Sequence, residues 1–329
     1  MIHDDIKNFP EQFLFEPRVQ SSIRTGDGVH AKKFEQIIVA GMGGSHLAAD
    51  ILKTWHPELP ITVWSDYGLP HIPANKIKKT LFIASSYSGN TEETTDAMRA
   101  AKKRGIALAA LAAGGEIIAL AKKYGAPYVE MPNLQIQPRL ALGYSMKALL
   151  ALLGEKKLSH EISKLSKQLL HIDAENFGKH LAQKLHGRMP VIYASTCNAA
   201  IAYNWKIKLN ETGKIPAFCN TVPELNHNEM SGFGGQKKSA MLSRKFYFLF
   251  LKDAADDARI VKRMDALEKI YRSRGHHVEI IELAGATRLV KIFSSLMCAD
   301  WTAFFIARAC GIDPESVPLV GEFKKMIAI

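Results

Sequence analysis

The sequence predicts an α/β protein with two halves, each a mainly parallel sheet flanked by helices. Short apolar runs typical of buried strands alternate with longer runs of helical periodicity, which is the pattern of parallel sheets covered by helices. The pattern is interrupted by the lysine-rich segment 155–173 and restarts at residue 189. A length of 329 residues is enough for two domains with separate cores. We therefore predict domains at 1–153 and 154–329.

The first half contains five runs that predict strands, with helical runs between them. The strands are at 36–41, 61–64, 80–85, 107–113 and 127–131, and the helices at 46–55, 91–104 and 116–124. Segment 140–154 is apolar on most faces, which predicts a buried helix. Segment 155–173 has apolar residues at helical spacing, which predicts an amphipathic surface helix that joins the halves.

The second half repeats this order of strands and helices. Its predicted strands are at 189–195, 214–220, 246–251 and 277–283, and its helices at 197–209, 255–273 and 287–310. Two halves of similar size and order indicate a duplicated fold, although no close residue-level repeat is visible.

Composition and charge narrow the class of protein. The chain is 47% hydrophobic and 23% charged, as in soluble globular proteins. The four cysteines form no CxxC pair, which argues against a zinc site and a disulfide scaffold and favours a reducing cytoplasm. We find no signal segment and no membrane-length apolar run, so we expect a cytoplasmic protein without a membrane partner. The net charge of +11 is spread along the chain, so we expect attraction of phosphorylated small molecules rather than nucleic-acid binding.

A glycine-rich turn follows the first strand. The run VAGMGGSHLAAD (39–50) places Gly41, Gly43 and Gly44 before Ser45, where a helix begins. Such a turn at a helix N-terminus can hold an anion, and it is also typical of a tight strand-to-helix turn with a serine cap. It lacks the third glycine of the dinucleotide fingerprint and the lysine of the P-loop, so we expect no nucleotide cofactor.

A second hydroxyl-rich turn follows the third strand. Ser86, Ser88 and Thr91 lie between that strand and the next helix. The carboxyl ends of parallel strands share one edge of a sheet, and ligands of open α/β sheets bind there. Two such turns predict a phosphate pocket with neutral donors, which suits a monophosphate ester that must be released. Its candidate residues are Gly44, Ser45, Ser86, Ser88 and Thr91.

Six blocks occur in an order that identifies a family. They are GMGGS (41–45), SDYGLP (65–70), SYSGNTEET (86–94), PRLALGY (138–144), KLNETGKIPAF (208–218) and PELNHNEMSGF (223–233). Together they resemble the bifunctional phosphoglucose/phosphomannose isomerases, which are built from two sugar-isomerase (SIS) domains. The resemblance covers nearly the whole chain. It implies interconversion of fructose 6-phosphate with glucose 6-phosphate, mannose 6-phosphate or both through a cis-enediolate, without cofactor or metal.

The resemblance also implies catalytic roles. An aldose–ketose isomerase needs a carboxylate to carry a proton between C1 and C2, a donor for the enediolate, and groups that open the sugar ring. Glu211 matches the carboxylate, Arg139 the enediolate donor, and His227 and Lys324 the ring-opening pair. Glu211 follows a helix and Arg139 begins one, which are the ends that the helix dipole disfavours for their charges. Both positions therefore favour a functional role.

The resemblance also implies expectations about the C-terminal segment and about the arrangement of subunits. Alignment on DPESVPLVGEFK favours Lys324 over Lys325, with Val317, Val320 and Phe323 on the buried side of a terminal helix. In the family the histidine reaches the neighbouring subunit's site, which implies a homodimer. Glu224 is read as a supporting carboxylate near His227.

Some features leave alternatives open. Asn204 stands where the family usually has arginine, which leaves the preference between glucose and mannose 6-phosphate undecided. A sugar-phosphate-binding regulator would keep the serine and threonine pocket without needing Glu211 or Lys324. Such regulators usually add a helix-turn-helix, and none is visible in residues 1–35.

Overall fold

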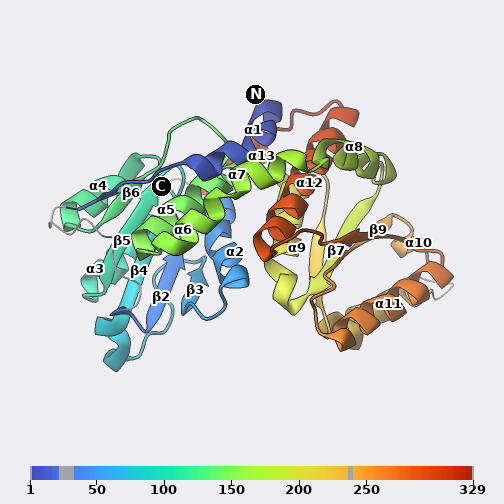
Figure 1. Ribbon diagram of the computed structural model, residues 1–329, viewed down its shortest axis with the longest axis horizontal. Helices are drawn as coiled ribbons and strands as arrows, with labels where there is room; N and C mark the ends of the chain where they lie inside the picture. The colour runs from blue at the N-terminus through green and yellow to red at the C-terminus, as the bar shows by residue number, and fades with distance from the viewer. Residues whose placement is uncertain (1, 22–32, 236–239, 328–329) are drawn as a thin grey trace. The chain divides into compact units, whose positions relative to one another are not determined.

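The protein forms two compact units, each with its own sheet. The computed structural model describes residues 2–21, 33–235 and 240–327. Contacts divide the chain into Lys7–His171, here the N-terminal unit, and Met1–Ile6 with Ile172–Ile329, here the C-terminal unit (Figure 1). Both units have mainly parallel sheets with helices on their faces, so the predicted α/β class is confirmed.

The N-terminal unit contains a six-stranded sheet in the order β1-β6-β5-β4-β2-β3. Its strands are β1 (Val19–Gln20), β2 (Gln36–Ala40), β3 (Ile61–Trp64), β4 (Thr80–Ser85), β5 (Ala107–Ala112) and β6 (Tyr128–Glu130). All neighbours are parallel except β1, which pairs antiparallel with β6. The two-residue β1 was not predicted, because so short an edge strand has no periodic signal.

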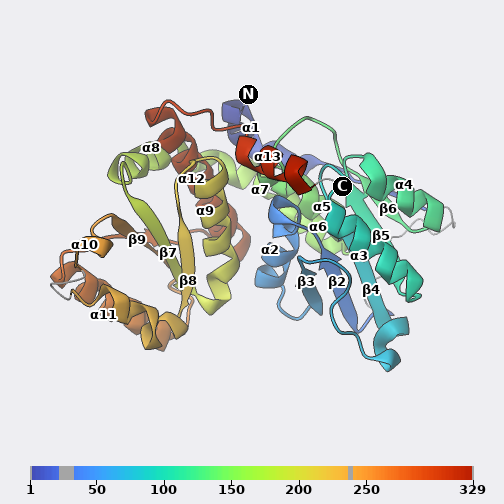
Figure 2. The same cartoon turned by 180° about the vertical axis from the view of Figure 1, so that it is seen from behind.

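Helices cover both faces of this sheet, as Figures 1 and 2 show. They are α2 (Leu47–Trp55), α3 (Glu92–Lys103), α4 (Gly115–Tyr124) and α5 (Leu142–Leu153). Ile38, Phe82 and Leu108 pack with buried residues of α3 and α4 in one core cluster. Every residue of β4 is buried, as expected for a parallel strand covered on both faces.

The segment after α5 differs from the single helix expected over 155–173. It breaks into α6 (Lys156–Ser163), α7 (Leu165–Gln168) and the 3-10 turn Leu169–His171. Ile162, Leu165 and Leu169 are fully buried, and contacts group the segment as far as His171 with the N-terminal unit. The expected joining helix is therefore a part of the first core.

The C-terminal unit contains a four-stranded parallel sheet in the order β10-β9-β7-β8. Its strands are β7 (Met189–Ser195), β8 (Phe218–Val222), β9 (Phe246–Lys252) and β10 (His277–Glu282). Strand β8 begins four residues later and ends two residues later than the predicted strand over 214–220. It is an edge strand and mostly half-exposed, so its sequence lacks the continuous apolar run that marks β9.

Helices also flank this second sheet (Figure 1). They are α8 (Ala174–Lys184), α9 (Ala199–Glu211), α11 (Ala258–Ser273) and α12 (Arg288–Ala309), with the short α1 (Ile2–Lys7) and α10 (Ala240–Ser243) and the terminal α13 (Pro318–Ile327). Tyr193, Phe248 and Phe250 form an aromatic core with Tyr271 of α11. His3 of α1 packs edge-on against Trp301 of α12, with ring centroids 5.1 Å apart.

Candidate functional site

Close backbone approach shapes the glycine-rich turn after β2. A Cβ atom on Gly41 would lie 2.6 Å from the Ser85 carbonyl oxygen at the end of β4. A Cβ atom on Gly44 would lie 2.6 Å from the backbone nitrogen of Arg139. Contacts this short exclude any side chain, so both glycines are required by packing. The turn is thereby held between the end of β4 and the 3-10 turn Pro138–Leu140.

The two hydroxyl-rich turns are hydrogen-bonded to each other. The Tyr87 N–H donates to Ser45 Oγ at 3.1 Å, and Ser85 Oγ donates to the Ser45 carbonyl oxygen at 2.5 Å. Ser86 Oγ and Thr91 Oγ1 lie 2.8 Å apart. A hydroxyl can donate and accept, so these groups can turn their protons toward an anion.

The predicted phosphate-binding residues differ in exposure. Gly44, Ser45 and Ser86 are buried, Thr91 is half-buried, and Ser88 is exposed, where its Oγ accepts from the Asn90 N–H at 3.3 Å. The structure brings Ser45, Ser86 and Thr91 to one edge of the first sheet and places Ser88 in the same loop. An anion at this edge would meet neutral donors.

Arg139 belongs to this edge as well. Its side chain is fully buried, and Nη1 donates to Gln137 Oε1 at 3.3 Å. It lies in a 3-10 turn just before α5, and Gly44 contacts its backbone. A buried guanidinium can stabilise negative charge that develops on a bound ligand, so Arg139 stays a candidate for this role.

Glu211 is the last residue of α9, which ends two residues later than predicted. Its side chain is half-buried. The Lys214 ammonium donates to the carbonyl oxygens of Glu211 and Ser316, and so connects the end of α9 to the segment before α13. Lys214 has a φ of 56°, a left-handed conformation that non-glycine residues seldom adopt.

Two contacts fix α9 against α12. The Lys208 ammonium donates to both carboxylate oxygens of Asp300, at 2.6 and 2.7 Å, and both side chains are almost completely buried. Trp205 Nε1 donates to Ser295 Oγ at 2.9 Å. Lys208 lies within one helical turn of Glu211, so these contacts hold in place the end of α9 that carries Glu211.

His227 lies in the 3-10 turn Glu224–His227 and is exposed. Glu229, two residues later, anchors the loop: its carboxylate accepts from Tyr193 Oη at 2.6 Å and from Asn220 Nδ2 at 2.5 Å. Burial raises the pKa of Tyr193 and raises that of Tyr271 to about 12, so both phenols remain protonated at neutral pH. Sequence reasoning missed Glu229, although it stands in the block that singled out His227.

Lys324 lies on α13, and here one expectation is wrong. No described residue of α13 is buried, Val317 is half-buried, and Val320 and Phe323 are 46% and 59% exposed. The apolar side of the helix therefore remains uncovered in the chain. Periodicity identifies an apolar side but does not show what covers it.

The corresponding edge of the second sheet is occupied by the protein's own charges. The Asp253 carboxylate accepts from Arg288 Nη1 at 2.7 Å and from Lys291 Nζ at 2.6 Å. Asp256 accepts from Ser195 Oγ at 2.7 Å. Burial tends to raise the pKa of Asp253, but the hydrogen bond from Lys291, the Ala255 N–H and the two cations lower it below its usual value. Asp256 has a raised pKa, chiefly because of burial.

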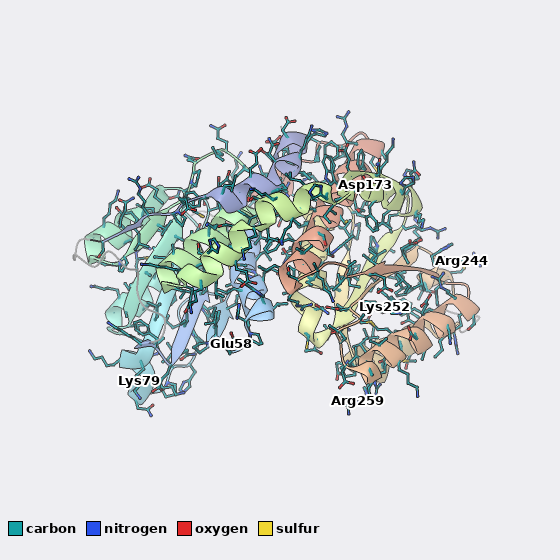
Figure 3. The ribbon with its side chains drawn as sticks, in the orientation of Figure 1. Glu58, Lys79, Asp173, Arg244, Lys252 and Arg259 are labelled. Atoms are coloured by element: carbon teal, nitrogen blue, oxygen red, sulfur yellow. The ribbon has the colours of Figure 1, made fainter. Side chains whose placement is uncertain are left out.

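Metal ligands, membrane segments and surface charge add three observations. Within residues 2–21, 33–235 and 240–327, no group of three or more His, Cys, Asp or Glu side chains could hold a metal ion. In the same ranges one helix, α12, is long and apolar enough to cross a membrane, but 78% of its apolar window is buried inside the structure, as in a core helix. Figure 3 shows the basic side chains Lys79, Arg244 and Arg259 pointing outward from different elements.

Comparisons with known proteins show which family the chain resembles. A family model described as the bacterial phospho-glucose isomerase C-terminal SIS domain matches residues 174–327. The bifunctional phosphoglucose/phosphomannose isomerase of Thermoplasma volcanium is 32% identical over 97% of this chain and 99% of its own length. The protein of the same name from Thermoplasma acidophilum is 32% identical over 99% of this chain and 97% of its own length.

A solved structure supports the fold. The glucosamine-6-phosphate deaminase of Thermotoga maritima superposes with a TM-score of 0.65 at 15% identity, over 96% of both chains. At that identity the likeness concerns the fold alone.

Proposed function

Because the chain belongs to the bifunctional phosphoglucose/phosphomannose isomerase family, we propose that it interconverts fructose 6-phosphate with glucose 6-phosphate and mannose 6-phosphate through a cis-enediolate. The observation that supports this best is the meeting of three segments at one sheet edge. The glycine-rich turn, the serine–threonine turn and the buried Arg139 lie together there. A phosphate anchor beside a fixed cation is what an isomerase needs to orient an open-chain sugar phosphate.

We assign the phosphate to Gly44, Ser45, Ser86, Ser88 and Thr91. The backbone N–H groups of the turn and the hydroxyls donate to the phosphate oxygens without the strong hold of a lysine or arginine clamp. Product release after each turnover is then not slowed by a tight ion pair.

The chemical steps are assigned to four residues. His227 and Lys324 transfer protons to and from the ring oxygen and the anomeric hydroxyl, which opens the ring. Glu211 removes the proton from one of C1 and C2 and returns it to the other, while Arg139 stabilises the enediolate between these two transfers. The overall change is redox-neutral, so it calls for no cofactor.

We favour catalysis over a purely regulatory role because Glu211 and His227, which ligand binding alone does not require, are held in place by other side chains. Lys208 and Lys214 hold the end of α9 that carries Glu211, and Glu229 holds the loop that carries His227. A sensor of sugar phosphates would need only the hydroxyl-rich edge.

We also propose a cytoplasmic homodimer that acts in glycolysis and gluconeogenesis, with His227 reaching the neighbouring active site. His227 is exposed, as this role requires. The helix α13 exposes five large apolar side chains, and such a patch is typical of a protein interface. They are Leu319, Val320, Phe323, Met326 and Ile327.

The direct test is to incubate the purified protein with fructose 6-phosphate and to quantify glucose 6-phosphate and mannose 6-phosphate separately. We expect both products, at equilibrium ratios after long incubation. Binding of fructose 6-phosphate without either product would contradict the isomerase assignment and support a regulator.

A further inference from the structure

The N-terminal unit has a polar cavity that the proposed catalytic roles do not use. Its volume is about 580 Å³, and it lies between α5, α6 and the segment before β1. None of the residues assigned to the sugar phosphate lines it. The charged residues that do are Glu16, Arg18, Lys147, Lys156 and His160.

The cavity exists because the side chains lining it from α6 are polar. Two helices that pack side by side normally bury apolar residues at positions i, i+3, i+4 and i+7. On α6 these positions, as they line the cavity, are Lys156, Ser159, His160 and Ser163. The buried apolar residue of α6 is Ile162, outside this stripe. The space beside α5 is therefore left open and polar instead of being closed by packing.

Lys147 on α5 brings a buried positive charge to this space. Its side chain is 1% exposed, and Nζ donates to Ser163 Oγ at 2.8 Å. Its contacts with the Ser159 carbonyl oxygen and Glu16 Oε1 are both 3.5 Å long. The Glu16 side chain is 86% exposed, so its charge is screened by water and compensates the buried ammonium weakly. A buried charge is stable when it is paired at close range.

We propose that this cavity is a second anion site, which binds a small phosphorylated metabolite independently of the catalytic pocket. Lys147 supplies the buried counter-charge, Arg18 a planar fork that suits phosphate oxygens, and Ser163 a hydroxyl. The volume is within the range of small-molecule sites. Lys156 and His160 line the same space.

Equilibrium dialysis with radiolabelled inorganic phosphate tests the proposal by stoichiometry. The wild-type chain should bind two phosphates, and Ser88→Ala with Thr91→Ala should lose the catalytic one only. Lys147→Met keeps the length and burial of the side chain and should weaken the second site by about tenfold or more, because its charge-assisted hydrogen bonds are lost. Thermal unfolding shows whether this variant is folded.

Two further variants keep the test decisive if Lys147→Met does not fold. Arg18→Gln changes an exposed residue and should weaken the second site alone. Glu16→Gln removes a competing carboxylate and should tighten that site by about two- to fivefold, the usual worth of an exposed charge pair. One phosphate per wild-type chain, removed by the Ser88 and Thr91 changes, would overturn the proposal. So would a second phosphate that is indifferent to Lys147, Arg18 and Glu16.

Discussion

At the scale of single residues, Glu211 is the side chain on which the proposed chemistry depends most. It ends a helix fixed by buried contacts. Glu211→Gln keeps its shape and removes its basicity, so turnover should fall by about 10²–10⁴, the usual effect of losing a positioned base. Substrate binding should change little, because the residues that we assign to the phosphate belong to the other unit.

Solvent-deuterium incorporation at C2 of the sugar phosphate measures this effect directly. Glu268→Gln on α11, where the carboxylate accepts from Arg272 Nε at 2.9 Å, is the matched control and should behave as wild type. Exchange at the wild-type rate in Glu211→Gln would remove Glu211 from the mechanism.

Replacing Gly44 should show whether this residue acts by positioning the Arg139 turn or only by stabilising the fold. An alanine Cβ would lie 2.6 Å from the Arg139 nitrogen, and backbone atoms cannot yield as a flexible side chain can. Gly44→Ala should displace the Arg139 turn, lower kcat/KM by about a hundredfold through misplacement, and cost about 1–3 kcal/mol of unfolding free energy through overpacking.

The matched control is Gly105→Ala. Gly105 has a φ of 70° and open space around it, so alanine there should cost about 1 kcal/mol without altering kcat/KM. Equal kinetic losses in both variants would mean that Gly44 acts only through stability.

The sequence predicts which residues carry this chemistry better than where they lie. The hydroxyls of Ser86 and Thr91 could be assigned to one turn because they are neighbours in the chain. The contact of Gly44 with Arg139 joins segments nearly a hundred residues apart, and no spacing rule encodes it. Glu229 was missed because a carboxylate that anchors a loop has the same sequence signature as a solvated one.

At the scale of elements, the edge of the second sheet depends on the salt bridges of Asp253. Its pKa is lowered in the folded state, so its stabilisation is present above the unfolded value near 3.8 and is lost as the pH falls through the folded value. Asp253→Asn should cost about 2–3 kcal/mol at pH 7, because two cations lose their shared partner. The difference from wild type should shrink below pH 4.

Denaturant unfolding between pH 7 and pH 3 checks this dependence. Asp257→Asn, in the same loop, removes the charge from an exposed surface pair with Arg259 and should change stability little at either pH. A pH-independent loss in Asp253→Asn would show that the charge of Asp253 is not what stabilises this edge.

Elements were predictable where packing fixes their composition. Buried parallel strands such as β4 and β9 are continuous apolar runs, and their bounds were found to within a residue. Edge strands are half-solvated, so β1 and β8 carry little pattern. The residues directly after α9 were predicted to begin a strand at residue 214. Lys214 instead adopts a left-handed conformation, which a lysine in the sequence does not predict.

At the scale of the whole molecule, the proposed homodimer predicts that two inactive variants can restore activity when they are mixed. Glu211→Gln and His227→Ala should each be nearly inactive alone. If His227 serves the neighbouring site, a mixed dimer has one site with both residues intact. Mixing the variants after mild dissociation should therefore restore about a quarter of wild-type activity, as random exchange in a two-fold dimer requires.

The readout is the rate of glucose 6-phosphate formation against time after mixing. The control is a mixture of Glu211→Gln with Arg139→Gln. A mixture of the two original variants that stays as inactive as its components would place His227 in its own chain's site.

Sequence patterns also predict least about how subunits assemble. An amphipathic pattern predicted α13 and its apolar side, yet Leu319 and Phe323 are exposed in the isolated chain. The identity of a covering surface depends on residues far away in sequence or in another copy. The two mainly parallel sheets flanked by helices, by contrast, could be predicted from local composition.

The buried pair between Lys208 and Asp300 has a consequence for heat tolerance. Removing charged groups from water becomes less costly as temperature rises, because their hydration has a strongly unfavourable entropy. The ion pair therefore keeps α9 attached to α12 at temperatures where the stabilisation from apolar contacts no longer increases. The carboxylate that ends this helix would then keep its place as the rest of the molecule approaches melting, so loss of activity on heating should follow global unfolding rather than precede it.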